Sequence, residues 1–143
     1  MTMTRDEKVD LLAAVPAMAP CSPAQLREIA RHCDLVTASP GNVLMREGAR
    51  AYEVFLILRG QAEVSRGGSH VALRGPGDYL GEIGVLACQT RDAEVSAHTP
   101  MTLLVFSARE FIGLMTTIPP LNRAVLTSLA SRLHDGDVLA GAR

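Results

Sequence analysis

Apolar positions near the start of the chain repeat at helical spacing. Two capping-box patterns, residues 4–7 and 22–25, each place Ser or Thr three residues before Glu or Gln, and Pro23 takes the first helical position of the second. The apolar stripe after the second pattern consists of Leu26, Ile29, Ala30 and Cys33. We therefore predict two short helices within residues 1–33, with one apolar face packed on the core.

The pattern changes between Asp34 and Ser107 to short segments rich in Val, Ile, Leu and Thr, separated by glycine and proline turns. Such segments are typical of antiparallel strands joined by tight turns. The clearest hairpin places Gly67-Gly68 between two of them, residues 62–65 and 70–73.

Helical spacing returns after Ser107. A third capping-box pattern, Ser107 to Glu110, begins a helix that Pro119-Pro120 should end, and a last helix runs from there to about His134. The apolar positions are Phe111, Ile112, Leu114 and Met115 in the first helix and Leu121, Val125, Leu126, Leu129 and Leu133 in the last. The order helices, strands, helices predicts an α+β fold in a single domain, residues 1–143, with strands in residues 34–107 and C-terminal helices in residues 108–134.

The amino-acid composition limits the classes of protein to which the chain can belong. With 143 residues, 48% of them hydrophobic and 20% charged, the chain has an ordinary composition for one globular domain with one core. Aromatic residues make up only 3%, so we expect an aliphatic core and no base-stacking platform for single-stranded nucleic acid. A net charge of −1 predicts no basic surface for nucleic acid or for an anionic membrane.

The N-terminal segment is charged, and no apolar run approaches the ~18 residues of a membrane span. We therefore expect a soluble, cytoplasmic protein without membrane contact. The three cysteines, Cys21, Cys33 and Cys88, lack paired spacing, which predicts small buried hydrophobic residues rather than disulfides or a zinc site. Because no nucleophile-and-base set and no phosphate-binding loop motif is present, we expect no enzyme activity, no catalytic residue, no metal and no cofactor.

The most informative segment is residues 77–86, with Arg91 nine residues after Glu82. Gly81 and Gly84 let the backbone approach a ligand closely, and a short apolar turn there would direct unpaired N–H groups at an anion. Arg91 supplies a permanent, forked cation suited to phosphate. An ionised Glu82 only accepts hydrogen bonds, so it suits the hydroxyl groups of a sugar. Together these residues indicate a pocket for a small phosphorylated sugar.

Residues 80–95 resemble the phosphate-binding cassette of the cyclic nucleotide-binding domain family and match its length without a gap. The resemblance extends to residues 40–48, to residues 54–60 and to residues 75–78. It implies an eight-stranded antiparallel β-roll, similar to a jelly roll, flanked by N-terminal and C-terminal helices. This is the sensor domain of catabolite activators and kinase regulatory subunits.

The resemblance also implies a ligand, cAMP by default or else cGMP. In the family, the glutamate at position 82 binds the ribose 2′-hydroxyl and the arginine at position 91 binds the cyclic phosphate, while the residue at 92 and nearby backbone N–H groups complete the cradle. The implied ligand-binding residues are Gly81, Glu82, Ile83, Gly84, Arg91, Asp92 and Ala93. Gly136 and Asp137 lie roughly where relatives carry residues that cover the base.

Three positions depart from the family pattern. Gly84 replaces a usual Ala and Thr90 a usual Pro, and both changes should mainly loosen the turn. Asp92 stands where Ser, Thr or Ala is usual, and a carboxylate ~4 Å from a phosphate costs on the order of 1 to 4 kcal/mol. The Asp92 side chain could turn outward, pair with Arg91 and neutralise it, or accept hydrogen bonds from a guanine edge.

Arg91 has an alternative role. An arginine between strands can pair with neighbouring carboxylates in a solvated network, here with Glu82, Asp92 or Glu94. Alternation along residues 93–97 places Glu94 on the outer face of its strand. The spacing of the glycines and the glutamate favours a ligand role for Arg91.

Two functions from different classes follow. The first is a regulatory module that binds a cyclic nucleotide, shifts the helices after Ser107 and signals through an unknown effector protein. Only residues 135–143 follow the last helix, so we expect a stand-alone form without a DNA-binding helix-turn-helix. The second is a domain of the same fold that has lost nucleotide binding because of Asp92 and acts through protein contacts, with a possible homodimer through the last helix.

Overall fold

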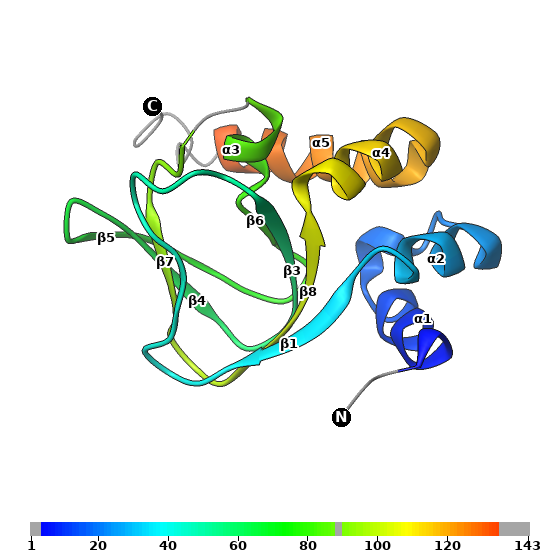
Figure 1. Cartoon of the computed structure of the whole chain (residues 1–143), viewed down its shortest axis with the longest axis horizontal. Helices are drawn as coiled ribbons and strands as arrows, with labels where there is room; N and C mark the ends of the chain where they lie inside the picture. Colours follow the sequence, from blue (N-terminus) through cyan, green and yellow to red (C-terminus); the bar gives the residue numbers. More distant parts are fainter. Residues whose placement is uncertain (1–3, 88–89, 135–143) are drawn as a thin grey trace.

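The computed structural model describes residues 4–87 and 90–134, and within these ranges eight strands form two antiparallel sheets. The first sheet consists, in spatial order, of β1 (Asp34–Ala38), β8 (Met101–Ser107), β3 (Glu53–Arg59) and β6 (Tyr79–Leu80). The second consists of β2 (Val43–Met45), β7 (Glu94–Ala97), β4 (Ala62–Arg66) and β5 (Ser69–Arg74). The two sheets form a roll (Figure 1), which confirms the predicted α+β fold with an eight-stranded antiparallel β-roll.

Helices flank the roll on two sides. The N-terminal group consists of α1 (Arg5–Ala13), the short 3₁₀ helix η1 (Pro16–Met18) and α2 (Pro23–Ala30). The others are α3 (Glu82–Leu86), α4 (Ala108–Thr117) and α5 (Pro119–His134). Figure 1 shows α1 and α2 beside the region where β1 begins, and α3, α4 and α5 together along another edge of the roll.

The predicted caps explain where the N-terminal helices begin. Thr4 and Glu7 form a complete capping box at α1, and Ser22 and Gln25 form one at α2. At α4 the Ser107 hydroxyl accepts the Glu110 N–H at 3.2 Å, but the Glu110 carboxylate lies 3.0 Å from the Ser107 hydroxyl and 2.6 Å from His32 Nδ1. Glu110 therefore joins the start of α4 to His32, which follows α2, and the hydrogen bonds of His32 with Glu110 and with Glu28 raise the pKa of His32.

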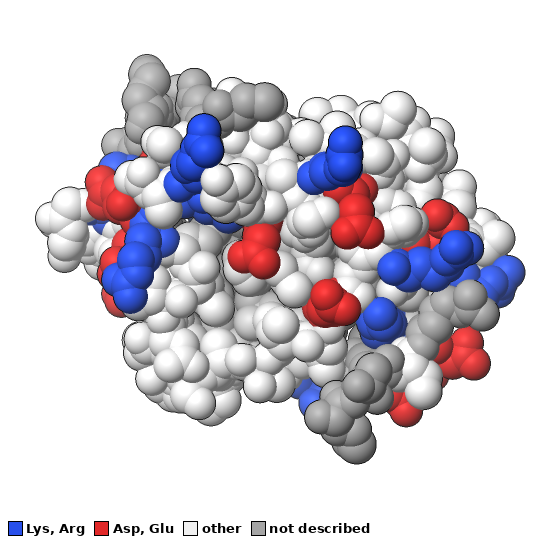
Figure 2. Space-filling view, in the orientation of Figure 1, with Lys and Arg blue, Asp and Glu red and all other residues white. Residues whose placement is uncertain are grey.

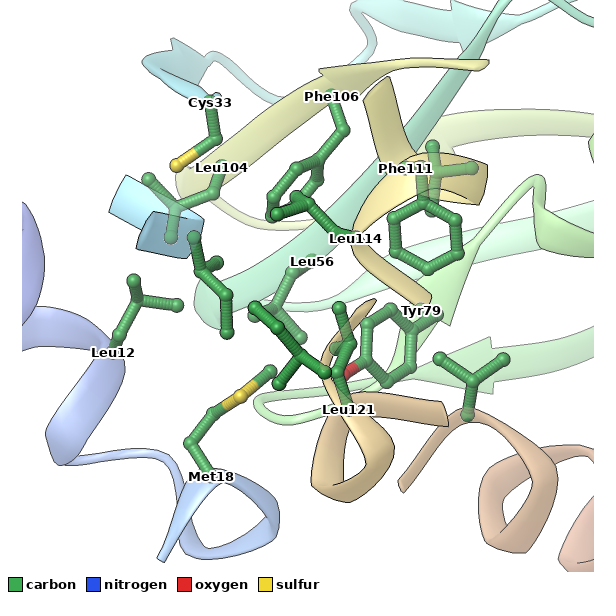
Figure 3. Close-up of a cluster of buried hydrophobic side chains, with 14 of the residues drawn as sticks. Leu12, Met18, Cys33, Leu56, Tyr79, Leu104, Phe106, Phe111, Leu114 and Leu121 are labelled. Atoms are coloured by element: carbon green, nitrogen blue, oxygen red, sulfur yellow. The ribbon is translucent and has the colours of Figure 1, made fainter. Parts of the chain in front are cut away.

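A hydrophobic cluster between the first sheet and the helices holds the fold together (Figure 3). The expected stripe of α2 lies in it, since Leu26, Ile29, Ala30 and Cys33 are all buried. The core is mainly aliphatic, but its centre is aromatic. The ring of Phe111 packs edge to face on Phe106 and Tyr79, with centroid distances of 5.5 and 5.9 Å.

The last helix is divided between the core and the surface. Leu121 and Val125 are fully buried in the chain's own core, whereas Leu126 is 57% exposed and Leu129 is half-buried. The side chain of Leu133 lies outside the described part of the chain. A dimer through the predicted stripe could therefore not use Leu121 and Val125, because both already pack inside the chain.

The predicted hairpin across Gly67-Gly68 is confirmed as β4 and β5, paired from Ala62 with Arg74 to Arg66 with Ser69. The short strand β6 pairs with β3 and leads directly into α3. This connection places the start of the cassette at the edge of the first sheet, while β7 carries its end into the second. The cassette thus joins the two sheets.

The surface carries charges of both signs. Figure 2 shows Lys and Arg side chains interspersed with Asp and Glu over the face in view. None of the helices in residues 4–87 and 90–134 combines the length and hydropathy needed to cross a membrane.

Candidate functional site

One cavity brings all seven predicted site residues together. Its lining includes the cassette residues Gly81, Glu82, Ile83, Gly84, Arg91, Asp92 and Ala93. Side chains from outside the cassette complete it, among them Arg66 at the end of β4 and Arg132 from α5. The free volume of the cavity is about 70 Å³. The described cassette residues that line this cavity thus form one concave site between the roll and the last helix.

Gly81 makes the close packing of this site possible. It precedes α3 with φ of +86°, a left-handed conformation that side chains rarely adopt. A Cβ atom here would overlap the Arg91 guanidinium and lie 2.9 Å from Met45 Sδ and 3.0 Å from the Glu53 carbonyl oxygen. The absence of a side chain at Gly81 thus makes room for Arg91, and the close approach of its backbone to a ligand stays a prediction.

Glu82 is a buried carboxylate, and one of its two oxygens accepts a hydrogen bond from another side chain. Its side chain is 1% exposed, and Oε1 accepts a hydrogen bond from Arg132 Nη1. Among the described residues Oε2 has no hydrogen-bond partner, although it too is buried. Burial raises the pKa of Glu82, and the nearby Arg132 opposes this shift. The site therefore holds an acceptor that is out of contact with water and unsatisfied.

Arg132 lines the cavity and is a residue that sequence reasoning missed. Besides Glu82 it binds the Tyr79 carbonyl oxygen, so it connects the end of α5 to both β6 and α3. The signal was present, because residue 132 follows Leu121 by eleven residues and Val125 by seven, which are close to three and two helical turns. An arginine on the apolar face of a helix needs an acceptor in the interior.

Arg91 is held by backbone oxygens rather than by carboxylates. Its side chain is 7% exposed, Nη1 donates to the Gly81 carbonyl at 3.0 Å and Nη2 donates to the Glu53 carbonyl at 2.7 Å. Burial lowers the pKa of Arg91. The alternative of an ion-pair network is wrong for the described residues, since neither Glu82, Asp92 nor Glu94 forms a salt bridge with Arg91 there. The Arg91 guanidinium is thus held in the cavity lining by backbone oxygens.

Asp92 pairs with Arg66, a residue that sequence reasoning did not consider. The Asp92 Oδ2 atom lies 3.5 Å from Arg66 Nη2, and the Asp92 carbonyl accepts a hydrogen bond from Arg66 Nε at 2.8 Å. Pairing with Arg91, one of the three orientations left open, is therefore wrong. Asp92 is near Arg66 because β4 and β7 pair from Ser65 with Glu94 onward.

The structure describes the β7 alternation and two of the three cysteines. Val95 and Ala97 are buried while Glu94 and Ser96 are half-buried, so the predicted alternation of β7 is confirmed. Cys21 and Cys33 are buried free thiols, and Cys88 lies outside the described residues. Gly136 and Asp137 also lie outside them. In the described part of the chain no three His, Cys, Asp or Glu side chains are grouped to hold a metal ion.

The family follows from a comparison with known protein domains. The profile described as Cyclic nucleotide-binding domain matches residues 35–117, which run from the second residue of β1 to the end of α4 and include the whole cassette. The chain belongs to this family. Membership confirms the resemblance inferred from the cassette.

Two relatives are longer proteins. A Pycsar effector protein of Xanthomonas perforans is 32% identical over 111 residues, which are 77% of this chain and 37% of that protein. A cyclic nucleotide-gated potassium channel of Mesorhizobium japonicum is 33% identical over 109 residues, 76% of this chain and 30% of that protein. This chain thus spans about a third of the length of these curated relatives.

Solved structures agree on the fold. A cAMP-binding acyltransferase from Mycobacterium smegmatis, in a mutant form, matches with a TM-score of 0.81 and 27% identity over 92% of this chain and 42% of that chain. The CBD2 of PKAR bound to Sp-2Cl-cAMPS matches with a TM-score of 0.80 and 19% identity over 97% and 93% of the two chains. At 19% identity the second likeness shows the fold alone.

Proposed function

We propose that this chain is a regulatory module that binds cAMP or cGMP through its cassette and passes the signal to an effector protein. The observation that carries the proposal is the unsatisfied Oε2 atom of Glu82, buried in the same cavity as Arg91. A buried acceptor without a partner costs free energy, which a ribose hydroxyl would recover. Arg91 supplies the opposite chemistry, a cation for the cyclic phosphate.

Each predicted site residue has a distinct role in this proposal. Glu82 accepts from the ribose 2′-hydroxyl and Arg91 binds the phosphate. The backbone of residues 81–84 and Ala93 shape the cradle. Asp92 lies at its edge, with its charge turned to Arg66.

Arg132 connects the site to α5. Pockets for small ligands usually hold about 300 to 1,000 Å³, whereas the free volume here is about 70 Å³. A nucleotide that binds Glu82 must therefore displace the Arg132 side chain, and this displacement changes what holds the end of α5. Ligand binding and α5 position are thus linked through one ion pair.

The test of the proposal is a calorimetric titration of the purified protein with cAMP, cGMP and 2′-deoxy-cAMP. We expect cAMP or cGMP to bind with a micromolar or lower Kd. If cAMP binds, we expect 2′-deoxy-cAMP to bind about tenfold more weakly, since it leaves Glu82 unpaired. In Glu82→Ala the two adenine nucleotides should bind equally, because the residue that distinguishes them is gone.

A second candidate is a protein-interaction domain of the same fold without a ligand. Arg132 in the cavity and Asp92 in the cradle are the observations that favour it. Absence of any binding by cAMP and cGMP at millimolar concentration would reject the sensor and support this second candidate.

Removing the Arg132 side chain should strengthen nucleotide binding. In Arg132→Ala the ligand no longer competes with an ion pair for Glu82, so we expect Kd to fall by a factor of up to about ten. Arg123→Ala is the matched control, because it removes an exposed arginine from the same helix and should leave Kd unchanged. Weaker binding by Arg132→Ala alone would instead assign Arg132 a direct contact with the ligand.

A further inference from the structure

The cradle contains a negative charge where an anion is proposed to bind. Asp92 follows Arg91 directly, lines the same cavity and has a side chain that is 35% exposed. A carboxylate at that position repels a phosphate unless another group neutralises it. Arg91 forms no salt bridge with Asp92, because the Arg91 guanidinium is directed to the carbonyl oxygens of Gly81 and Glu53.

Arg66 has the geometry to neutralise Asp92. It is the last residue of β4, and its side chain is 24% exposed and lines the cavity beside Asp92. Its Nε atom donates to the Asp92 carbonyl oxygen at 2.8 Å while Nη2 lies 3.5 Å from Oδ2. One guanidinium therefore contacts both the backbone and the carboxylate of the same residue. The backbone contact fixes the peptide between Asp92 and Ala93.

The approach of the two side chains is a consequence of the sheet. β4 and β7 are paired, with Ser65 opposite Glu94, so that Arg66 and Asp92 continue the two strands beyond the last pair. Glu47 also lies near this end, since its Oε1 atom accepts the Gly67 N–H at 3.0 Å. The Glu47 carboxylate is thus already hydrogen-bonded to the turn, and Asp92 is the acid that Arg66 contacts.

We propose that Arg66 is a positioning residue of the phosphate site, which holds the Asp92 carboxylate and offsets its charge so that the cradle accepts an anion. This inference rests on the proposed nucleotide site. Arg66 acts through Asp92 and makes no contact with the ligand itself. The pair Arg66 and Asp92 then stands in place of the small neutral residue that is usual after the cassette arginine.

The test is a double-mutant cycle on nucleotide binding. The proteins are the unmodified chain, Arg66→Ala, Asp92→Ser and the double variant, each titrated with cAMP and with cGMP by calorimetry. We expect Arg66→Ala to weaken binding at least about tenfold, because an uncompensated carboxylate then faces the phosphate. The double variant should bind within about threefold of Asp92→Ser, because without the carboxylate Arg66 has nothing to offset.

Controls separate this role from a merely structural one. Arg59→Ala removes an exposed arginine from β3, outside the cavity lining, and should not change Kd. Arg66→Lys retains the charge but not the two-point contact, so its Kd should lie between those of the unmodified chain and Arg66→Ala. Thermal unfolding of each variant establishes that the proteins compared are folded.

The outcomes are distinct for the two proposals. If the unmodified chain binds and Arg66→Ala binds equally well, the role of Arg66 is rejected while the nucleotide site stands. If the loss in Arg66→Ala persists in the double variant, Arg66 contacts the ligand directly and its action through Asp92 is rejected. If the unmodified chain binds neither nucleotide, the proposed function fails, and so does the inference, since Arg66 has not compensated for Asp92.

Discussion

Arg91→Ala will bind cyclic nucleotide about 30- to 1,000-fold more weakly than the unmodified protein, a loss of about 2 to 4 kcal/mol. The charge-assisted hydrogen bonds of the Arg91 guanidinium to the phosphate disappear, and the other arginines that line the cavity are Arg66, Arg74 and Arg132. Arg66 faces Asp92 and Arg132 faces Glu82. Calorimetric titration with cAMP and cGMP measures the change.

The same substitution affects stability, because Arg91 donates to the carbonyl oxygens of Gly81 and Glu53. Their loss should lower the free energy of unfolding by about 1 to 3 kcal/mol. Arg91→Lys is the control that keeps the positive charge without the forked geometry, and it should retain more binding than Arg91→Ala. An Arg91→Ala protein that is folded and binds with unchanged Kd would exclude Arg91 from the ligand site.

Gly81→Ala should lower both stability and nucleotide binding. An alanine with φ of +86° costs about 1 to 2 kcal/mol. Its Cβ would also displace the Arg91 guanidinium and crowd Met45, which adds about 1 to 3 kcal/mol. We expect the free energy of unfolding, measured by urea denaturation, to fall by about 2 to 5 kcal/mol. Kd should rise at least about tenfold, because the displaced Arg91 no longer meets the phosphate.

Gly41→Ala separates backbone strain from the clash. Gly41 has φ of +89°, nearly that of Gly81, but a Cβ there would meet no atom within 4 Å. Its substitution should cost only the backbone term of about 1 to 2 kcal/mol and leave Kd unchanged. Equal effects of the two substitutions on stability and binding would show that Gly81 is required for its backbone conformation alone.

The local sequence pattern correctly predicted where several helices and strands begin and end. The capping boxes at Thr4 and Ser22 begin α1 and α2, and Gly67-Gly68 forms the turn of the β4–β5 hairpin. Caps and tight turns involve residues only a few positions apart, so a short window of sequence contains all the groups that interact. The cassette is predictable for the same reason, since residues 81–93 contain every predicted site residue.

The partners of the site residues were not predictable in this way. Three contacts determine how the charged groups of the site are paired. They are Arg132 with Glu82, Arg91 with the Glu53 carbonyl and Arg66 with Asp92. They join residues 50, 38 and 26 positions apart in the sequence. Many arginines and carboxylates could have paired, and only the packing of α5 and the register of β4 with β7 select these pairs.

The sequence by itself determined an α+β fold with antiparallel strands, the place of the cassette and the two residues that carry opposite chemistry, Glu82 and Arg91. Hydrophobic periodicity, glycine turns and caps are local properties of the chain and are sufficient for the α+β fold, whereas the β-roll was implied by the resemblance to a known family. Only the tertiary structure decided that Arg132 forms an ion pair with Glu82 and that Asp92 faces Arg66 instead of Arg91. Charge pairing depends on distances in space, and those distances exist only once the helix and the two sheets have packed together.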